Sequence, residues 1–332
     1  MKIAIVKLSA LGDIVHAMVV LQFIKKHYQK IDIDWVVEEG YRELLEFHPD
    51  INKLHVVYIK KAKQKKSLYL FLNELRKVRQ FGSYDLVIDM QGLIKSAVIS
   101  RLISSPITLG FDKSSIRESI ASIFYNKTFK YGYDENIIER NLNLIKFSLG
   151  FVFDQEEIQH KLPFLHSSKK YLINKLSNIK KNILLVPNAS FKSKRYPVIK
   201  LAELTTMLDA NFLIIWGNQE EKIIADEIKA LSPNVNICEK LSIDSLISLI
   251  KQVDLVIGSD TGPTHMAWAL NIPSITLFGP TPGYRNTYIT NINTIIESDS
   301  KVNPLKINKK DYSIKDINTR DIVKISEKLL KE

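Results

Sequence analysis

Residues 1–17, MKIAIVKLSALGDIVHA, place an aspartate directly after a glycine where an apolar strand gives way to a helix. Ile3–Val6 is a short, uninterrupted apolar run, as expected for a parallel strand that is covered on both faces. From Ile14 onward the apolar residues recur at helical spacing. Asp13 is therefore expected at the strand-to-helix junction, the edge at which open α/β sheets bind their ligands.

The same succession of strand and helix repeats through both halves of the chain. Strand-like runs are KIAIV, IDWVV, LHVVYI and YDLVIDM in the first half, and NILLVP, FLIIWG, VDLVIG and SITLFG in the second. This alternation predicts an α/β protein with two Rossmann-like, doubly wound parallel sheets.

Residues 151–170 lack clear periodicity and contain Pro163, which is typical of a connection between domains. We therefore predict domains at 1–160 and 161–332. Two such domains in tandem are expected to face each other across a cleft, a preferred place for ligands. The last helical stretch, residues 318–332, could pack back on the first domain.

The composition is typical of a globular protein, with 332 residues, 45% of them hydrophobic and 25% charged. No apolar stretch reaches the roughly 18 residues that a membrane span needs. Residues 1–20 show no signal-peptide cleavage pattern. The single cysteine, Cys238, excludes an internal disulfide and fits a reducing compartment. We therefore expect a cytoplasmic protein.

Residues 51–80 carry nine basic side chains against one acid, Glu74, which gives this segment a net charge of +8. Such a segment predicts an anionic partner, unless it is only a solvated lysine-rich loop. No helix-turn-helix, zinc-finger or aromatic RNA-binding signature accompanies the charge, so nucleic acid is not expected. A membrane surface or a phosphorylated substrate fits better.

The segment VDLVIGSDTGPTHMAWALNIPSITLFGPT, residues 253–281, combines two strands with two glycine-containing turns. The first turn, 258–263, leads into a helix, and Pro263 is tolerated in a first helical turn. A helix N-terminus after a glycine turn is a ready anion site, so this segment and the neighbouring loop 279–283 predict phosphate binding. The alternative is an ordinary helix with Asp260 as its N-cap.

Charged side chains follow two other strands of the second half. Lys192, Lys194 and Arg195 could neutralise a leaving diphosphate, or could be three solvated charges. Glu221 could accept hydrogen bonds from a ribose, or lie in a first helical turn. Motifs with metal-ligand spacing, the Gly-x-Gly-x-x-Gly dinucleotide pattern and the P-loop are all absent. We therefore expect helix ends and lysine or arginine, without a metal, to hold the diphosphate.

Five blocks, in this order along nearly the whole chain, resemble the heptosyltransferases of lipopolysaccharide inner-core synthesis (glycosyltransferase family 9), most closely their type I group. The blocks are KLSALGDIVHA (7–17), DWVVEEG (34–40), VIDMQGLIKSA (87–97), RESIASIFYN (117–126) and SDTGPTHMAWAL with PSITLFGPT (259–281).

The resemblance implies a GT-B fold in which the N-terminal domain binds the acceptor and the C-terminal domain the nucleotide sugar. It implies transfer of L-glycero-D-manno-heptose from ADP-heptose to the first Kdo of Kdo2-lipid A, with inversion and with neither metal nor other cofactor. The implied setting is the anionic cytoplasmic face of an inner membrane, to which the protein would bind peripherally.

The resemblance also implies roles for particular residues. Asp13 matches the family's catalytic aspartate and Lys194 its catalytic lysine, although Tyr196-Pro197 replaces Trp-Pro and a residue is deleted upstream, so Lys192 is a rival. The implied donor-binding residues are Ser190, Lys192, Lys194, Glu221, Asp260, Thr261, Gly262, His265, Gly279 and Thr281. The implied acceptor-binding residues are Ser9, Gly12, Lys60, Lys61, Gln91 and Arg117. Lysines 60 and 61 stand where a close relative would carry arginines, so anion recognition there could differ in geometry.

In an inverting transfer the acceptor hydroxyl must lose its proton as the new bond forms. Asp13 at a helix N-terminus would be ionised and would accept that proton by virtue of its placement. Its alternative role is that of a helix N-cap. Rival functions are a type II enzyme acting on a heptosylated acceptor, a GT-B-fold nucleotide-sugar epimerase and a non-catalytic membrane-surface binder.

Overall fold

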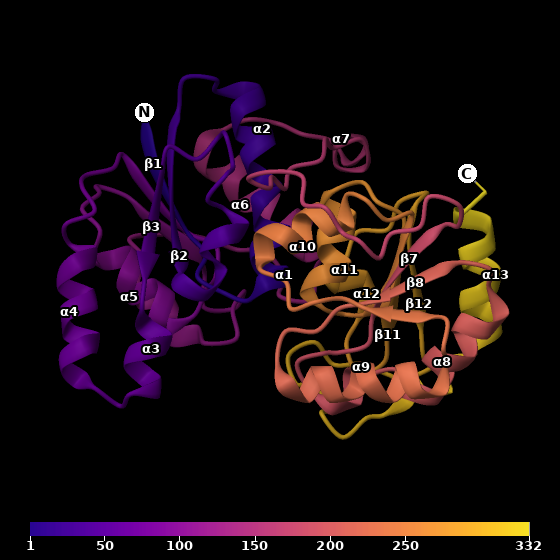
Figure 1. Ribbon diagram of the computed structural model, residues 1–332. Helices are drawn as coiled ribbons and strands as arrows, with labels where there is room; N and C mark the ends of the chain where they lie inside the picture. The colour runs from indigo at the N-terminus through magenta and orange to yellow at the C-terminus, as the bar shows by residue number, and fades with distance from the viewer. Residues whose placement is uncertain (332) are drawn as a thin grey trace. The chain divides into compact units, whose positions relative to one another are not determined.

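The computed structural model describes residues 1–331, and the chain divides between Phe164 and Leu165 into two compact units (Figure 1). Each unit contains one six-stranded parallel sheet with helices on its faces. The α/β class and the two Rossmann-like sheets expected from the sequence are confirmed.

The first sheet has the strand order β3-β2-β1-β4-β5-β6, with every pair parallel. Its strands are β1 (Lys2–Val6), β2 (Asp32–Glu38), β3 (Lys53–Val57), β4 (Leu86–Asp89), β5 (Thr108–Phe111) and β6 (Lys127–Phe129). Its helices and 3₁₀ turns are α1 (Leu11–Met18), α2 (Val20–His27), η1 (Glu39–Leu44), α3 (Ile59–Gln64), α4 (Leu68–Val78), α5 (Ile94–Leu102), η2 (Ser119–Phe124), α6 (Ile137–Leu149) and α7 (Gln155–Gln159).

The second sheet has the order β12-β11-β10-β7-β8-β9, again all parallel. Its strands are β7 (Asn182–Val186), β8 (Asn211–Ile214), β9 (Val235–Ile237), β10 (Leu255–Ser259), β11 (Ser274–Phe278) and β12 (Asn293–Glu297). Its helices and 3₁₀ turns are η3 (Lys192–Lys194), α8 (Val198–Met207), α9 (Gln219–Leu231), α10 (Ile243–Ile250), α11 (Gly262–Ala269), α12 (Gly283–Asn286), η4 (Ser313–Asp316) and α13 (Thr319–Leu329).

Counted within its own unit, each sheet follows the order 3-2-1-4-5-6 that is typical of Rossmann folds. The strand order reverses between β1 and β4 in the first unit and between β7 and β10 in the second. At such a switch point the connections leave the sheet in opposite directions, so the loops at the carboxyl ends of these strands enclose a binding crevice. Each unit therefore has one defined place where its fold favours a ligand.

Complete burial of the central strands explains why they read as continuous apolar runs. Ile3, Ile5 and Val6 of β1 have no exposed surface, and neither have Leu255 and Ile257 of β10. Gly258 of β10 pairs with Val186 of β7, and a Cβ atom at this glycine would lie 2.6 Å from the Val186 Cβ atom. Only glycine therefore allows β10 to pass β7 at the switch point of the second sheet.

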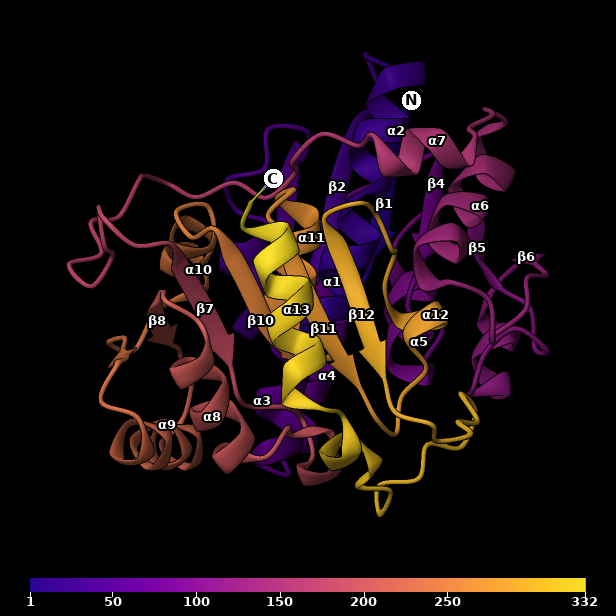
Figure 2. The same ribbon diagram turned by 90° about the vertical axis from the view of Figure 1, so that its right-hand side faces the viewer.

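The last helix, α13, lies within the second unit, where it packs against α8 and β11 (Figure 2). Its N-cap is Asn318, whose side chain accepts a hydrogen bond from the Arg320 N–H group. Ile322 and Leu329 of this helix are buried in the apolar core of the second unit together with Ile275 of β11. The amphipathic pattern of residues 318–331 is thus used to cover the second sheet.

The connection between α3 and α4 contains a non-glycine residue with a positive φ. The Ser67 N–H group donates to the Ala62 carbonyl oxygen (3.1 Å) and Lys66 has φ of 48°, as in a Schellman motif with Lys66 at the position usually taken by glycine. Ser67 then caps α4 by accepting a hydrogen bond from the Leu70 N–H group. Lys66 therefore occupies the left-handed region at an energetic cost.

Replacing Lys66 by glycine should relieve this cost. We expect Lys66→Gly to raise the free energy of unfolding by about 1 kcal/mol, since the gain in the left-handed region exceeds the added entropy of the unfolded chain. Calorimetric unfolding of the full chain measures the change. Lys65→Gly is the matched control, because Lys65 has φ of −79° and gains nothing from glycine; equal effects of the two changes would contradict the prediction.

Candidate functional site

The carboxylate of Asp260 is the centre of a buried polar cluster at the switch point of the second sheet. Asp260 directly follows β10, and its side chain is almost completely buried. Its Oδ2 atom accepts from Lys194 Nζ (2.8 Å), Thr281 Oγ1 (2.9 Å) and Asn286 Nδ2 (3.2 Å). Its Oδ1 atom lies 2.9 Å from His265 Nε2. One carboxylate therefore ties together η3, α11, α12 and the loop after β11.

Burial by itself would raise the pKa of Asp260, but the charge of Lys194 and the hydrogen bonds of His265 and Lys194 hold the pKa well below its usual range. The carboxylate is thus ionised at neutral pH. The N-cap of α11 is Thr261, so the alternative assignment of Asp260 as N-cap was wrong by one residue. Pro263 lies in the first turn of α11, as expected.

The two candidate lysines are placed differently. Lys194 is buried and paired with Asp260, whereas Lys192 is exposed. Arg195 forms an ion pair with Glu220 (2.7 Å), so it is tied to the first turn of α9. Ser190 is exposed in the loop after β7. The structure therefore joins Lys194, and not Lys192, to the residues that follow β10 and β11.

Several buried polar atoms around this cluster have no hydrogen-bond partner among the described residues. They belong to Asn188, Ser193, Ser259 and Thr261. Asn188 and Ser193 follow β7 and the other two lie at the end of β10, so all four belong to the switch point. Buried polar groups are normally paired, and unpaired ones at a ligand-binding edge mark a surface suited to a polar ligand. Asn188, Ser193 and Ser259 were not selected from the sequence, although all three lie at or shortly after the carboxyl ends of β7 and β10, where ligand-binding residues are expected.

Glu221 and Gly279 contribute to local structure. The Glu221 carboxylate accepts from the Gly217 N–H group (2.7 Å), and Asn218 caps α9 by accepting from the Glu221 N–H group (3.1 Å). Glu221 thus lies in the first turn of α9, the helix that follows β8, as the alternative interpretation of this residue predicted. A Cβ atom at Gly279 would lie 2.6 Å from the Ile314 Cβ atom, so this glycine makes room for η4.

In the first unit, Asp13 is exposed in the first turn of α1. The N-cap of this helix is Ala10, and Asp13 lies at the third helical position, so the alternative assignment of Asp13 as the N-cap was wrong. Its Oδ2 atom accepts from the Ala10 N–H group (3.1 Å), which satisfies an amide at the helix start. No group among residues 1–331 donates a hydrogen bond to the remaining oxygen, Oδ1, so this atom can accept from a ligand.

Gln91 holds the loop that carries Asp13. Its Oε1 atom accepts from the backbone N–H groups of Leu8 (2.7 Å) and Ser9 (3.2 Å), and its Nε2 atom donates to Ser9 Oγ (3.1 Å). Lys95 Nζ also donates to Ser9 Oγ (2.9 Å). Ser9 and Gln91 follow β1 and β4, the two strands at the switch point. The proximity of these two predicted acceptor-binding residues is therefore a direct result of the strand order, whereas Lys95 was not among the predicted site residues.

Asp89, the last residue of β4, holds the backbone of the turn at Gln91 in place. It is fully buried and accepts from the N–H groups of Gln91 (2.8 Å) and Gly92 (3.1 Å) and from the Tyr125 hydroxyl (2.8 Å). Burial raises the pKa of Asp89 against the effect of these hydrogen bonds, and it also raises the pKa of Tyr125. A carboxyl group buried beneath the switch point thus fixes the Gln91 turn.

Two further titratable groups at this edge of the first sheet were not selected from the sequence. Burial raises the pKa of Tyr41 in η1, and the charges of Asp13 and Glu38 act in the same direction. Burial likewise raises the pKa of Glu38 at the end of β2, against a hydrogen bond from the Lys60 N–H group (2.8 Å) and the charge of Lys95. Glu38 ends β2 and Tyr41 follows it, so both groups lie at the carboxyl edge of the first sheet, where Asp13 follows β1.

The predicted acceptor cations follow β3 and β5 at the same edge of the first sheet. Lys60 and Lys61 lie exposed in α3, and Arg117 is exposed in the loop before η2. Buried Arg140 of α6 donates to the carbonyl oxygen of Ser115 (2.8 Å) in that loop, and also to those of Tyr131 (2.7 Å) and Gly132 after β6. The cations therefore stand on segments whose backbones are anchored, while their side chains face solvent.

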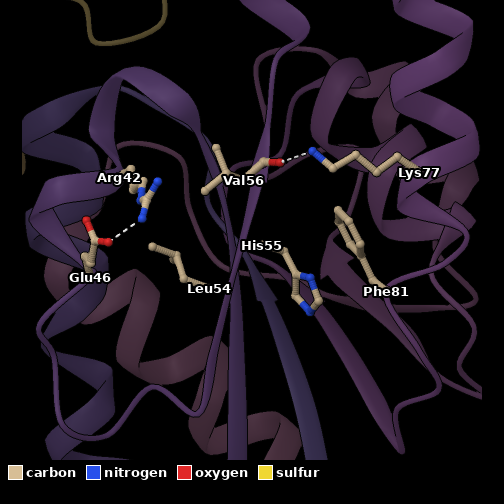
Figure 3. A pocket seen from close by; sticks show the side chains of 7 residues that line it. All are labelled: Arg42, Glu46, Leu54, His55, Val56, Lys77 and Phe81. Atoms are coloured by element: carbon tan, nitrogen blue, oxygen red, sulfur yellow. Dashed lines mark hydrogen bonds and ion pairs between the residues drawn. The ribbon is translucent and has the colours of Figure 1, made fainter.

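A pocket of about 360 Å³ opens at the outer edge of the first sheet, beside β3 (Figure 3). None of the predicted catalytic, donor-binding or acceptor-binding residues lines this pocket. His55 in this pocket stacks on Phe81 at 4.1 Å between ring centroids and accepts or donates a hydrogen bond with the Tyr84 hydroxyl (2.8 Å). The lining residues are Arg42, Glu46, Leu54, His55, Val56, Lys77 and Phe81. Strand β3 ends the sheet, so this pocket lies away from the switch point.

Within residues 1–331, no group of three or more His, Cys, Asp or Glu side chains is arranged to hold a metal ion. Over the same residues, no helix has the length and apolarity required to cross a bilayer.

Solved structures share this fold along the entire chain. Escherichia coli heptosyltransferase WaaC, in a structure described with ADP, superposes with a TM-score of 0.80 at 24% identity, covering 99% of this chain and 100% of that one. E. coli ADP-heptose LPS heptosyltransferase II superposes with a TM-score of 0.74 at 19% identity, covering 99% and 98%. The two Rossmann-like units thus have a GT-B-like architecture.

Sequence relatives identify the family. Residues 73–313 match the model described as "Glycosyltransferase family 9 (heptosyltransferase)". Lipopolysaccharide heptosyltransferase 1 of Campylobacter coli is 42% identical, with 99% of each chain covered. Lipooligosaccharide heptosyltransferase 2 of Campylobacter jejuni subsp. jejuni is 26% identical, covering 100% of this chain and 99% of that one. The chain belongs to glycosyltransferase family 9, and the resemblance noted in the sequence is confirmed.

The buried pair of Lys194 and Asp260 predicts a defined pH dependence of stability. Because the folded-state pKa of Asp260 lies below the unfolded value of about 3.9, its stabilisation is complete above that pH and is lost as pH falls through the folded-state pKa. At pH 7 we expect Asp260→Asn to lose about 3 kcal/mol of the free energy of unfolding, since Lys194 is left unpaired. Denaturant unfolding from pH 7 to pH 3 should show this difference narrowing below about pH 4.

The control for this prediction is Asp209→Asn, because the Asp209 carboxylate pairs with Lys180 on the surface and its side chain is 85% exposed. An exposed pair of this kind contributes little. A difference between wild type and Asp260→Asn that does not change with pH would contradict the assignment of Asp260 as a buried carboxylate ionised by its partners.

Proposed function

We propose that this protein transfers L-glycero-D-manno-heptose from ADP-heptose to the first Kdo of Kdo2-lipid A during assembly of the lipopolysaccharide or lipooligosaccharide inner core. The observation that carries the proposal is the Asp260 cluster at the second switch point, together with an exposed Asp13 at the first. Family membership supports heptosyl transfer. Assignment to the type I reaction is supported by 42% identity to a heptosyltransferase 1, against 26% to a heptosyltransferase 2.

We assign the donor to the second unit. The proposed site for the ADP diphosphate is the switch point, where Lys194 supplies a buried cation and Asn188, Ser193, Ser259 and Thr261 supply polar atoms that lack partners among the described residues. Glu221 in the first turn of α9 is the proposed partner of the ribose. Thr281, Gly262 and His265 keep the surrounding loops in place through Asp260 and α11. ADP is also the nucleotide named for the E. coli WaaC structure.

The proposed reaction is a single displacement with inversion. The acceptor hydroxyl oxygen attacks the anomeric carbon of the heptose, the bond from that carbon to the diphosphate oxygen breaks, and ADP leaves with the electron pair. Asp13 accepts the proton of the attacking hydroxyl. Lys194 offsets the negative charge that develops on the leaving diphosphate, a contribution that is greatest in the transition state. Asp260 fixes the position of Lys194 and also reduces the net charge that this lysine presents.

We propose that no metal takes part. The two Asp260 oxygens already interact with four nitrogen or hydroxyl groups, which leaves this carboxylate poorly suited to bind a cation. Acceptor carboxylates and phosphates are assigned to Lys60, Lys61 and Arg117, which lie exposed at one edge of the first sheet with Gln91 and Ser9. Because lipid A is a membrane lipid, the protein would work at the anionic cytoplasmic face of the inner membrane.

The test is incubation of the purified protein with ADP-heptose and Kdo2-lipid A in EDTA, with the product read by mass spectrometry. We expect one added heptose per acceptor. Product only with an already heptosylated acceptor would assign the type II reaction. Release of epimerised free sugar without acceptor would assign an epimerase, and loss of activity in EDTA that added Mg²⁺ restores would contradict metal independence.

Asp13→Asn isolates the proposed general base. Since the amide oxygen of asparagine can still accept from the Ala10 N–H group, the helix start is preserved while proton acceptance is lost. We expect kcat to fall about 10²- to 10⁴-fold, with ADP affinity unchanged in calorimetric titration. Asp32→Asn, at the opposite end of the first sheet, is the matched control. A kcat of Asp13→Asn that stays within a few-fold of the wild-type value would contradict the role of Asp13 as general base.

A further inference from the structure

We propose that the hairpin formed by α3 and α4 docks the protein on an anionic bilayer by inserting Leu68, Tyr69 and Leu72 among the lipid headgroups. We call these three residues the apolar wedge. The proposal rests on the proposed function for one point, the reason why the protein would dock: an enzyme whose acceptor is embedded in lipid must work at a membrane. The docking itself follows from the surface of the hairpin.

Helix α4 has two apolar faces, and only one of them is used inside the protein. Val78 is completely buried, and Phe71 packs against the same apolar core cluster of the first unit. The apolar wedge lies on the first turns of the helix and is exposed, with 70% of Leu68, 73% of Tyr69 and 44% of Leu72 accessible. Large exposed apolar residues that follow one another on one helix are unusual on a soluble surface and mark an interaction site.

The charges around the apolar wedge are almost all positive. Lys60, Lys61, Lys63, Lys65 and Lys66 are exposed on α3 and the following turn. The one acid of the segment, Glu74, accepts from the Tyr58 N–H group (3.1 Å) and lies 3.9 Å from Lys77, on a later turn of α4. The lysines at the tip therefore remain available to lipid phosphates, and each basic residue near an anionic surface contributes about 1 kcal/mol.

The turn at the tip of the hairpin keeps a cation where glycine would be favoured. Lys66 has a positive φ and immediately precedes Ser67 and the apolar wedge. A lysine at this position places a charge next to the exposed apolar side chains, in spite of the backbone cost. Segments that lie in a membrane interface typically combine lysine or arginine with large apolar and aromatic side chains, as this turn and the apolar wedge do.

The hairpin lies at the edge of the sheet that the reaction uses. Helix α3 follows the carboxyl end of β3, as the loop with Asp13 follows the carboxyl end of β1, and Figure 1 shows α3 and α4 side by side beyond that end of the first sheet. Insertion of the wedge would therefore bring the acceptor-binding edge to the lipid surface. Nucleic acid would explain the lysines but not the exposed aliphatic side chains.

The test uses the full chain and vesicles of phosphatidylethanolamine with or without phosphatidylglycerol. We expect flotation with the anionic vesicles only. Leu68→Ser with Tyr69→Ser should lower the partition coefficient at least about tenfold, and Lys65→Gln or Lys66→Gln should lower it about fivefold each. Ile199→Ser in α8, at 73% exposure, is the matched control and should change nothing. Equal flotation with both vesicle types, or an unchanged Ser variant, would overturn the proposal.

Two further readouts separate insertion from other causes. Tyr69→Trp should show a blue-shifted emission on addition of anionic vesicles, and no shift would overturn insertion. The Leu68→Ser, Tyr69→Ser variant should lose heptosyl transfer to acceptor embedded in vesicles but keep it with deacylated, water-soluble acceptor. Equal loss with both acceptors would overturn the docking role. Absence of transfer by the wild type, while vesicle binding follows the pattern above, would contradict the proposed function and leave docking supported.

Discussion

A buried carboxylate has to be compensated by the protein around it, and in the second unit this requirement organises the whole ligand-binding edge. Asp260 draws its partners from η3, α11, α12 and the loop after β11. Were one of these partners lost, the remaining charge would stay buried at a considerable cost. The loops that follow β7, β10 and β11 are therefore held in one arrangement by the protein itself. Under the proposed function, groups preorganised in this way would need little rearrangement during transfer.

The sequence predicted the doubly wound sheets and eight of the twelve strands in the described residues, because buried apolar runs are local signals, but it missed β5, β6, β9 and β12. The family resemblance, not these signals, suggested Asp13 and Lys194 as catalytic candidates. It could not choose between Lys192 and Lys194. That choice depends on the pairing of β7 with β10, which places the residues after Val186 next to those after Gly258. The role of Asp260 as a common acceptor depends in the same way on contacts 21 to 66 residues away in the chain. Non-local contacts of this kind leave no trace in a local pattern.

In the first unit, too, the surroundings of Asp13 and Gln91 depend on the fold and not on the local sequence. Their presence in recognisable blocks was visible in the sequence, but the position of Asp13 at the third residue of α1 depends on where the chain leaves β1. The support of Gln91 by buried Asp89 and Tyr125 depends on the neighbouring strands β4 and β5 and on the segment after η2. The candidate site was thus identifiable by residue type, whereas its supporting residues emerged only from the fold.

Arg140 shows how far such support can lie from the chemistry. This guanidinium is buried on α6 and donates to the carbonyl oxygen of Ser115, in the segment that carries Arg117, and to those of Tyr131 and Gly132 after β6. A change at Arg140 would release that segment without altering any group that meets a substrate. A genetic search for inactive alleles would then recover Arg140 beside Asp13, and the two would look alike until acceptor affinity and turnover were measured separately.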